Sequence, residues 1–153
     1  MTAETNLQTS RRFMEECMNQ GNLDLMDELC TPDCITHDPA EEGDIVGIEA
    51  HKERLQKYLT AMPDMQFTID DQLASRDRVA TRWTVRATNT GSLLGMPPTG
   101  KKLEVSGMTI DRFDAVGRIA EAWDEWDNLG FMQQLGLIPE AMLQQQGGGE
   151  VLR

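Results

Sequence analysis

The chain has 153 residues, which is enough for one domain with a substantial hydrophobic core. Its hydrophobic fraction of 39% and charged fraction of 26% are those of a globular protein. The net charge of −12 argues against binding to nucleic acid or to anionic membrane surfaces, since both need basic patches. The first residues are polar and no apolar run approaches about 18 residues, so we expect neither a signal peptide nor a membrane span.

The three cysteines, Cys17, Cys30 and Cys34, are an odd number, which favours reduced thiols and a cytoplasmic location. Cys30 and Cys34 are spaced to face one another on a helix. A zinc site would need more ligands than this region offers, so we expect structural thiols.

The first part of the chain has the periodicity of helices. Residues 5–20 place apolar side chains at three- and four-residue spacing, and Gly21 is a plausible stop. A second helix is expected over 23–30 with Asn22 as its cap, followed by a short extended piece over 34–37 and an acidic loop. A third helix is predicted for 48–62, with His51 on its buried face and Pro63 closing it.

After this helix the hydrophobic pattern changes to period two. It predicts strands over 66–73, 79–89, 101–113 and 118–127, then a helix over 128–135 and a short helix after Pro139. In the second strand Thr81, Trp83 and Val85 point one way, and Arg82 and Arg86 the other.

Helices followed by an antiparallel meander predict one α+β domain over 1–140, with a flexible tail over 141–153. A curved antiparallel sheet packed on three helices forms a cone, and a cone can hold a small apolar ligand.

Two tryptophans lie among four acids in EAWDEWDNLGFMQQLG, residues 121–136. On a regular strand Glu121, Trp123, Glu125 and Asp127 share one face, while Ala122, Asp124 and Trp126 share the other. If Asp127 points into the cone, the apolar wall raises its pKa, and it can take a proton from carbon beside a carbonyl. Alternatively, Asp127 or Asn128 caps the following helix. The two roles do not exclude each other.

Three segments carry a family resemblance: CITHDPAEEGDIVGIEAHKERL, TNTGSLLGMPPTGKKLEVSG and DRFDAVGRIAEAWDEWDNLGFMQQLG. In order and spacing, over about residues 7–138, they resemble the SnoaL-like polyketide cyclases of the nuclear transport factor 2-like superfamily. The resemblance implies a cystatin-like cone, a homodimer, and ring closure of a polyketide ester by an intramolecular aldol reaction without cofactor or metal. The net charge, as argued above, speaks against a nucleic-acid or membrane partner.

The resemblance also implies site residues. It makes Asp127 the acid/base and His37 the second polar catalytic residue, acting on a small, apolar carbonyl substrate. Asn89 stands where many relatives carry histidine; its amide can donate a hydrogen bond to the carbonyl but cannot shuttle a proton. The further candidates for substrate binding are His51, Trp83, Phe67, Arg82, Met108 and Trp123.

Each candidate has a structural alternative. His37 pairs with Asp38 or a loop backbone, His51 is a packed side chain, Arg82 and Arg86 pair with surface acids, and the aromatic residues form ordinary core.

Two other functions remain open. The first is an epoxide hydrolase of the same fold, whose chemistry typically uses an Asp-Arg-Asp relay to activate water. Arg82 or Arg86 could reach Asp127, but the sequence does not identify a second aspartate. The second is a non-catalytic module that binds a ligand or dimerises.

Overall fold

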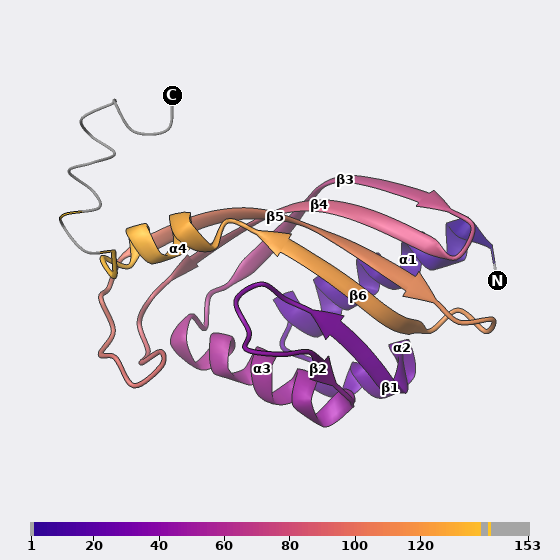
Figure 1. Ribbon diagram of the computed structural model, residues 1–153, viewed down its shortest axis with the longest axis horizontal. Helices are drawn as coiled ribbons and strands as arrows, with labels where there is room; N and C mark the ends of the chain where they lie inside the picture. Colours follow the sequence, from indigo (N-terminus) through magenta and orange to yellow (C-terminus); the bar gives the residue numbers. More distant parts are fainter. Residues whose placement is uncertain (1, 139–140, 142–153) are drawn as a thin grey trace.

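A computed structural model describes residues 2–138 and 141 (Figure 1). A curved six-stranded sheet arches over helices on its concave side. In chain order the elements are α1 (Ala3–Arg12), a π-helix (Phe13–Asn19), a 3₁₀ turn (Leu23–Leu25), α2 (Met26–Leu29), β1 (Cys30–His37), β2 (Ile45–Val46), α3 (Ile48–Ala61), β3 (Gln66–Ser75), β4 (Arg78–Thr88), β5 (Lys102–Phe113), β6 (Ile119–Trp126) and α4 (Asn128–Gln134). This architecture confirms the predicted α+β class.

The strand order is β2-β1-β6-β5-β4-β3. β3 to β6 form the predicted antiparallel meander, but β1 lies parallel to β6, so the sheet is mixed. The sequence predicted only residues 34–37 of β1, because Thr31-Pro32-Asp33 has the composition of a helix stop. Proline is accommodated because the register with β6 is interrupted between Cys30 and Ile35, where no ladder donor is needed.

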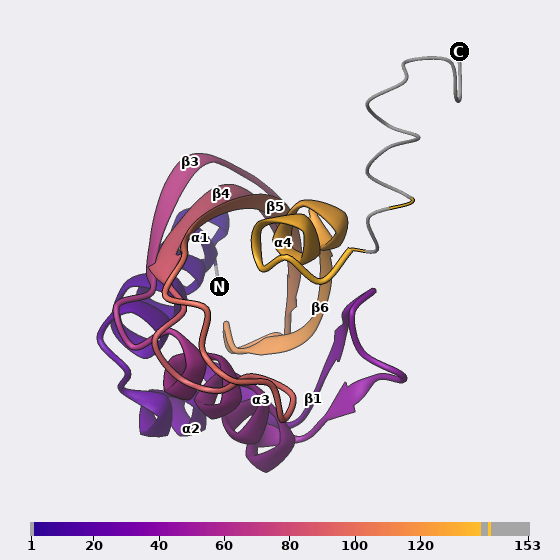
Figure 2. The ribbon, with the colours of Figure 1, turned by 90° about the vertical axis from the view of Figure 1, so that its left-hand side faces the viewer.

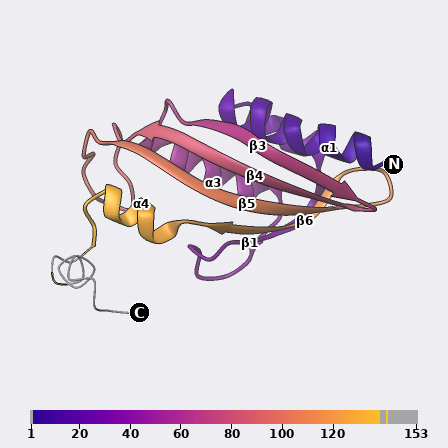
Figure 3. The ribbon, with the colours of Figure 1, turned by 90° about the horizontal axis from the view of Figure 1, so that it is seen from above.

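The helices cover the concave side of the sheet (Figure 2). α1 packs against β3 and β4, α3 against β1 and β2, and α4 against β5. Seen from above, β3 to β6 show their convex face, with α3 behind them (Figure 3). The concave face therefore carries the core, and any internal cavity must lie between it and the helices.

The first helix changes character halfway. After Arg12 it continues as a π-helix, whose Asn19 side chain bonds the backbone of Phe67 at the open edge of β3. The amide oxygen accepts from the Phe67 N–H at 2.7 Å, and the amide nitrogen donates to the Phe67 carbonyl at 2.9 Å. This pair satisfies backbone groups that an edge strand would leave to solvent.

Other sequence predictions are only partly met. The helix expected over 23–30 is a 3₁₀ turn followed by a single α-helical turn, and Asn22 makes no side-chain cap bond. All three cysteines are buried and form no disulfide.

Within the part of the chain that the structure describes, no helix has the length and apolarity needed to cross a membrane. The helix predicted after Pro139 and the flexible tail lie outside the described residues, apart from Ala141.

Candidate active site

A cavity of about 160 Å³ lies between the concave face of the sheet and the helices. Most of its wall is apolar, and each layer of the fold contributes to it. Representative lining residues are Met14, Leu55, Met62, Phe67, Val85 and Phe131. A cavity of this kind suits a small, largely apolar ligand held by a few polar groups.

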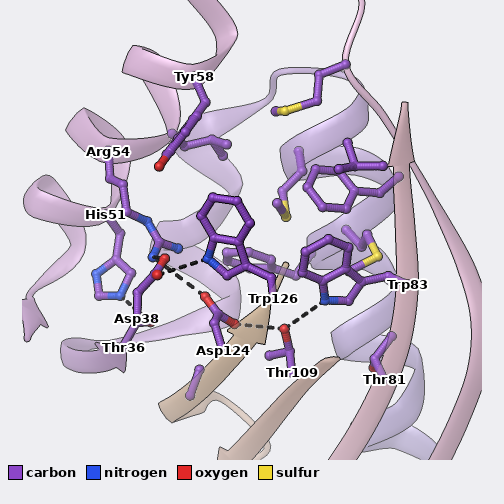
Figure 4. Close-up of a pocket in the computed structure, with 18 of the residues that line it drawn as sticks. Thr36, Asp38, His51, Arg54, Tyr58, Thr81, Trp83, Thr109, Asp124 and Trp126 are labelled. Atoms are coloured by element: carbon purple, nitrogen blue, oxygen red, sulfur yellow. Dashed lines mark hydrogen bonds and ion pairs between the residues drawn. The ribbon is translucent and has the colours of Figure 1, made fainter. Parts of the chain in front are cut away.

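The polar part of the wall centres on an arginine between two aspartates (Figure 4). Arg54, from α3, donates to Asp38 Oδ2 at 2.9 Å, and the same nitrogen lies 3.6 Å from Asp124 Oδ2. The side chains are only 21%, 5% and 16% exposed for Arg54, Asp38 and Asp124. One cation thus serves two nearly buried carboxylates, which electrostatically favours a neutral ligand over an anionic one.

Hydrogen bonds from the sheet hold both carboxylates in place. Trp83 Nε1 donates to Thr109 Oγ1 at 3.0 Å, and Thr109 Oγ1 donates to Asp124 Oδ1 at 2.7 Å. Trp126 Nε1 donates to Asp38 Oδ1 at 2.9 Å. Because the two indoles and the threonine hydroxyl fix the acids, the arrangement is preorganised before a ligand binds.

The register of the sheet brings these groups together. Asp124 pairs with Thr109 across β5 and β6, and Gly107 pairs with both Trp83 and Trp126. A Cβ at Gly107 would lie 2.5 Å from the Trp83 indole and 2.6 Å from the Trp126 Cβ, so no side chain fits there. Glycine at this position allows both tryptophans to line the same hollow.

The pKa of the Asp124 carboxyl is raised above its usual range, chiefly because the group is buried. Arg54 and the Thr109 hydroxyl act in the opposite direction, while Asp38 adds to the rise. A carboxylate with a raised pKa is a stronger base than one in water, and Arg54 lies close enough to stabilise its charge.

Two further polar side chains, His51 and Tyr58, lie on the cavity wall. The Nδ1 of His51 faces the carbonyl of Gly47 at 2.6 Å and therefore donates to it, and Nε2 lies 2.7 Å from Thr36 Oγ1. His51 therefore lines the cavity with both ring nitrogens engaged, in agreement with the packed alternative. Burial raises the pKa of Tyr58 to about 12, so its hydroxyl stays protonated.

Of the predicted site residues, Phe67, Trp83 and His51 line the cavity, and the others lie elsewhere. Asp127 is exposed and is the N-cap of α4: its Oδ1 accepts from the Gly130 N–H at 2.8 Å. Contrary to the expectation that it points into the cone, its carboxylate turns toward its own helix. Gly130 makes this cap possible, because a Cβ there would collide with the carboxylate.

His37 and Trp123 belong to the opposite face of the sheet. His37 bonds Asp44 at 2.8 Å and Glu121 at 2.6 Å, and its ring stacks on Trp123. Glu121 and, next, Asp44 raise the pKa of His37, which favours the imidazolium form. The side chain is fully occupied by these partners and is not one of the cavity-lining residues.

Asn89, Arg82 and Met108 also lie away from the cavity. Asn89 holds its loop together: it donates to the carbonyls of Ala61 and Gly91 and accepts from the N–H and hydroxyl of Thr99. Arg82 is exposed and 3.8 Å from Asp70, as the surface-acid alternative predicted. Met108 is 51% exposed on the outer face.

Replacing Asp127 with alanine is expected to lower the free energy of unfolding by about 1 kcal/mol, because α4 loses its N-terminal cap. Denaturant unfolding followed by circular dichroism measures this change. A loss of catalytic turnover without a loss of stability would instead support the acid/base role that the resemblance implies.

The sequence reasoning missed Asp38, Arg54, Thr109 and Asp124. One signal was available: Asp124 shares a strand face with Ala122 and Trp126, the less acidic face of β6. Arg54 lies one turn after His51 on the helix whose buried face was predicted. Nothing in the sequence indicated that Asp38 meets Trp126, because 88 positions separate them.

The comparisons with known proteins agree with this architecture. The family model for the SnoaL-like polyketide cyclases matches residues 8–135. TsrD from Streptomyces laurentii is 27% identical, with a TM-score of 0.78 over 90% of this chain and 99% of its own. IdmH from Streptomyces antibioticus, a candidate polyketide cyclase, is 30% identical, with a TM-score of 0.73 over 86% and 98%.

A third similar structure, AclR from Streptomyces galilaeus, is a candidate hydroxylase at 25% identity, with a TM-score of 0.79 over 90% of this chain and all of its own. A search of curated protein sequences gives no significant match. The family match spans most of the sequence and includes every residue of the Asp38–Arg54–Asp124 cluster. The chain therefore belongs to the SnoaL-like polyketide cyclase family.

Proposed function

We propose that this protein catalyses proton transfer on a neutral, largely apolar carbonyl compound without a cofactor, with Asp124 as the acid/base. Ring closure of the aldol type or isomerisation are the reactions that this chemistry serves. The observation that carries the proposal is the Asp124 carboxyl: it lines an apolar cavity, is only 16% exposed, and has a raised pKa.

The chemistry begins when the Asp124 carboxylate removes a proton from carbon beside the substrate carbonyl. General acid-base help of this kind is typically worth about 10² to 10⁴ in rate. The remaining acceleration comes from holding the two reacting carbons together in the cavity. The protonated Asp124 then returns its proton to the oxygen or carbon that becomes negative in the next step.

Arg54 and Asp38 support this cycle. Arg54 stabilises the charged form of Asp124 before the reaction, and Asp38 anchors the guanidinium at 2.9 Å. Asp38 is itself held by the Ala40 N–H at 2.8 Å and by Trp126, so the arginine cannot swing freely into the cavity. The cluster keeps Asp124 available as a base without offering a free cation to an anionic ligand.

The proposal is tested with 2-tetralone, a neutral bicyclic ketone with acidic hydrogens beside its carbonyl. In D₂O the wild-type protein is expected to accelerate exchange of these hydrogens for deuterium, which proton NMR follows directly. The same solution with the Asp124→Asn variant in place of wild type is the reference. If wild type exchanges the hydrogens no faster than this reference, the proposed function is contradicted.

Epoxide opening is a second candidate function, and one observation favours it. Two aspartates bridged by an arginine are the groups that the epoxide relay requires, and Asp38, Arg54 and Asp124 supply them on the cavity wall. In that reaction one carboxylate activates water and the other protonates the epoxide oxygen.

Incubation with cyclohexene oxide in ¹⁸O-labelled water distinguishes the two candidates. Labelled diol without ketone exchange supports the hydrolase, and exchange without diol supports the proton-transfer enzyme. A protein that binds 2-tetralone and does neither is a ligand-binding module.

A further inference from the structure

A second carboxyl group, Asp111, lies on the same cavity wall and has no role in the chemistry described so far. It belongs to β5 and is 9% exposed. Its Oδ2 accepts a hydrogen bond at 2.7 Å from the hydroxyl of Ser10, on the buried side of α1. The group lines the cavity together with Asp124, so both carboxyls can reach one ligand.

The sheet register fixes how the two acids are related. Thr109 pairs with Asp124, and Asp111, two residues after Thr109, pairs with Ala122, two residues before Asp124. Asp111 and Asp124 are therefore diagonal neighbours on the concave face, about 7 Å apart at the backbone. Both side chains line the same cavity, so an H–C–C=O unit bound there can meet one carboxyl group at each end.

The charged groups around Asp124 and Asp111 differ in sign. Asp124 has Arg54 and the Thr109 hydroxyl to hold it charged. Among the described residues, Asp124 from β6 is the charged group that acts on the pKa of Asp111, and it is an anion. The Asp111 charge in turn raises the pKa of the Cys30 thiol of β1. Burial, and to a lesser extent the Asp124 charge, raise the pKa of Asp111 to about 7, against the opposing effect of Ser10.

We propose that Asp111 is the general acid of this site: it is held protonated and gives its proton to the substrate carbonyl oxygen while Asp124 removes the proton from the adjacent carbon. The inference rests on the proposed function and assigns the two halves of the proton transfer to two residues. Pairs of carboxyls whose environments separate them into one acid and one base are a recurring catalytic arrangement.

The proton and electron balance closes. Asp124 takes the proton from carbon, the C–H electron pair forms the C=C bond of an enol, and the carbonyl π pair takes the Asp111 proton. In ring closure the enol carbon attacks the second carbonyl, and the new alkoxide receives the proton held by Asp124. The enol O–H returns its proton to Asp111 as the first carbonyl re-forms, so both residues recover their starting states.

This assignment also states what the ligand must carry at that end of the cavity. A protonated carboxyl donates a hydrogen bond to a neutral keto oxygen. A ligand carboxylate in the same place would meet two acids and an arginine that is already paired. We therefore expect 2-tetralone to bind and 1,2,3,4-tetrahydro-2-naphthoate, its carboxylate counterpart, to bind at least about tenfold more weakly.

The experiment compares wild type with Asp111→Asn, and uses Asp71→Asn, an exposed aspartate of β3, as the matched control. Infrared titration between about pH 5 and pH 9 follows the carbonyl stretch of a protonated carboxylic acid. The signal is expected to disappear near pH 7 in wild type and in Asp71→Asn, and to be absent in Asp111→Asn. An unchanged signal in Asp111→Asn would overturn the inference.

Exchange of 2-tetralone supplies the catalytic readout. Asp111→Asn is expected to slow exchange by about 10² or more and to lose the fall in rate above pH 7. If the wild-type protein exchanges the ketone and Asp111→Asn does so at the same rate and with the same pH profile, the inference is refuted. The proposed function would still stand.

If the wild-type protein does not accelerate exchange, the proposed function fails. Binding of 2-tetralone then still tests whether Asp111 is protonated and donates a hydrogen bond to the ketone. Quenching of Trp83 and Trp126 fluorescence by 2-tetralone should weaken about tenfold above pH 7 in wild type and stay constant in Asp111→Asn. Binding that ignores pH in both proteins refutes the inference.

Ser10→Ala provides a second variant, in case Asp111→Asn folds poorly. Removing the Ser10 hydroxyl takes away a bond that lowers the pKa of Asp111, so the descending limb of the pH profile should move to higher pH. A limb that does not move, or moves to lower pH, counts against Asp111.

Discussion

Replacing Asp124 with asparagine is expected to lower the rate of 2-tetralone exchange by about 10² to 10⁴ while leaving the protein folded. Asparagine keeps the shape of the side chain and can still accept from Thr109, but it cannot take a proton. Proton NMR measures the exchange rate, and circular dichroism with thermal unfolding measures the folded state. The effect should lie in the chemical step, so that binding of the ketone changes little.

Glu125→Gln is the matched control for this variant, because Glu125 is exposed on the other face of the same strand. It should exchange the ketone at the wild-type rate. If Asp124→Asn and Glu125→Gln proved equally active, the base would have to be sought elsewhere, and the cavity would be better interpreted as a binding site.

Replacing Arg54 with leucine is expected to reduce the free energy of unfolding by about 3 kcal/mol near neutral pH. The variant leaves Asp38 and Asp124 nearly buried without their shared cation. The pKa of Asp124, already raised by burial, should rise further, because Arg54 is the strongest influence lowering it. The native state then binds more protons than the unfolded state, so the stability of the variant should increase as pH falls.

Urea unfolding of wild type and Arg54→Leu at about pH 5 and pH 8 measures this difference. Arg82→Leu is the control, since Arg82 is exposed beside Asp70, and its removal should cost no more than about 0.5 kcal/mol. A variant whose deficit is the same at both pH values would show that Arg54 stabilises the fold through packing alone.

Much of the fold could be predicted from local pattern. In β3 to β6 apolar and polar residues alternate with period two, and α3 has a clear apolar face. These local patterns are enough to predict the type of each element. Of the two remaining strands, only residues 34–37 of β1 could be predicted in this way, and β2 could not. A proline and two polar residues obscure the first half of β1, and its place in the sheet depends on a parallel pairing with a strand some 90 positions away.

The site was predictable only in part. Alternation correctly placed Trp83 and Arg82 on opposite faces of β4, and Trp83 lines the cavity while Arg82 is exposed. For the acids of β6, alternation offered two faces and did not say which one meets the helices. The family resemblance favoured Asp127, whereas the fold aims Asp124 into the hollow. Asp38 and Arg54 come from a loop and a helix, and only the folded chain brings them to the same carboxylate.

The absence of a side chain at Gly107 has an evolutionary consequence. A glycine codon becomes an alanine codon by a single nucleotide change, and the added methyl group would collide with the Trp83 indole and the Trp126 Cβ, so that both side chains would have to shift. The same indoles hold Asp124, through Thr109, and Asp38 by hydrogen bonds, so the two acids would shift with them. Descendants of this sequence could therefore acquire, in one mutational step, both a differently shaped chamber and acids held in different positions.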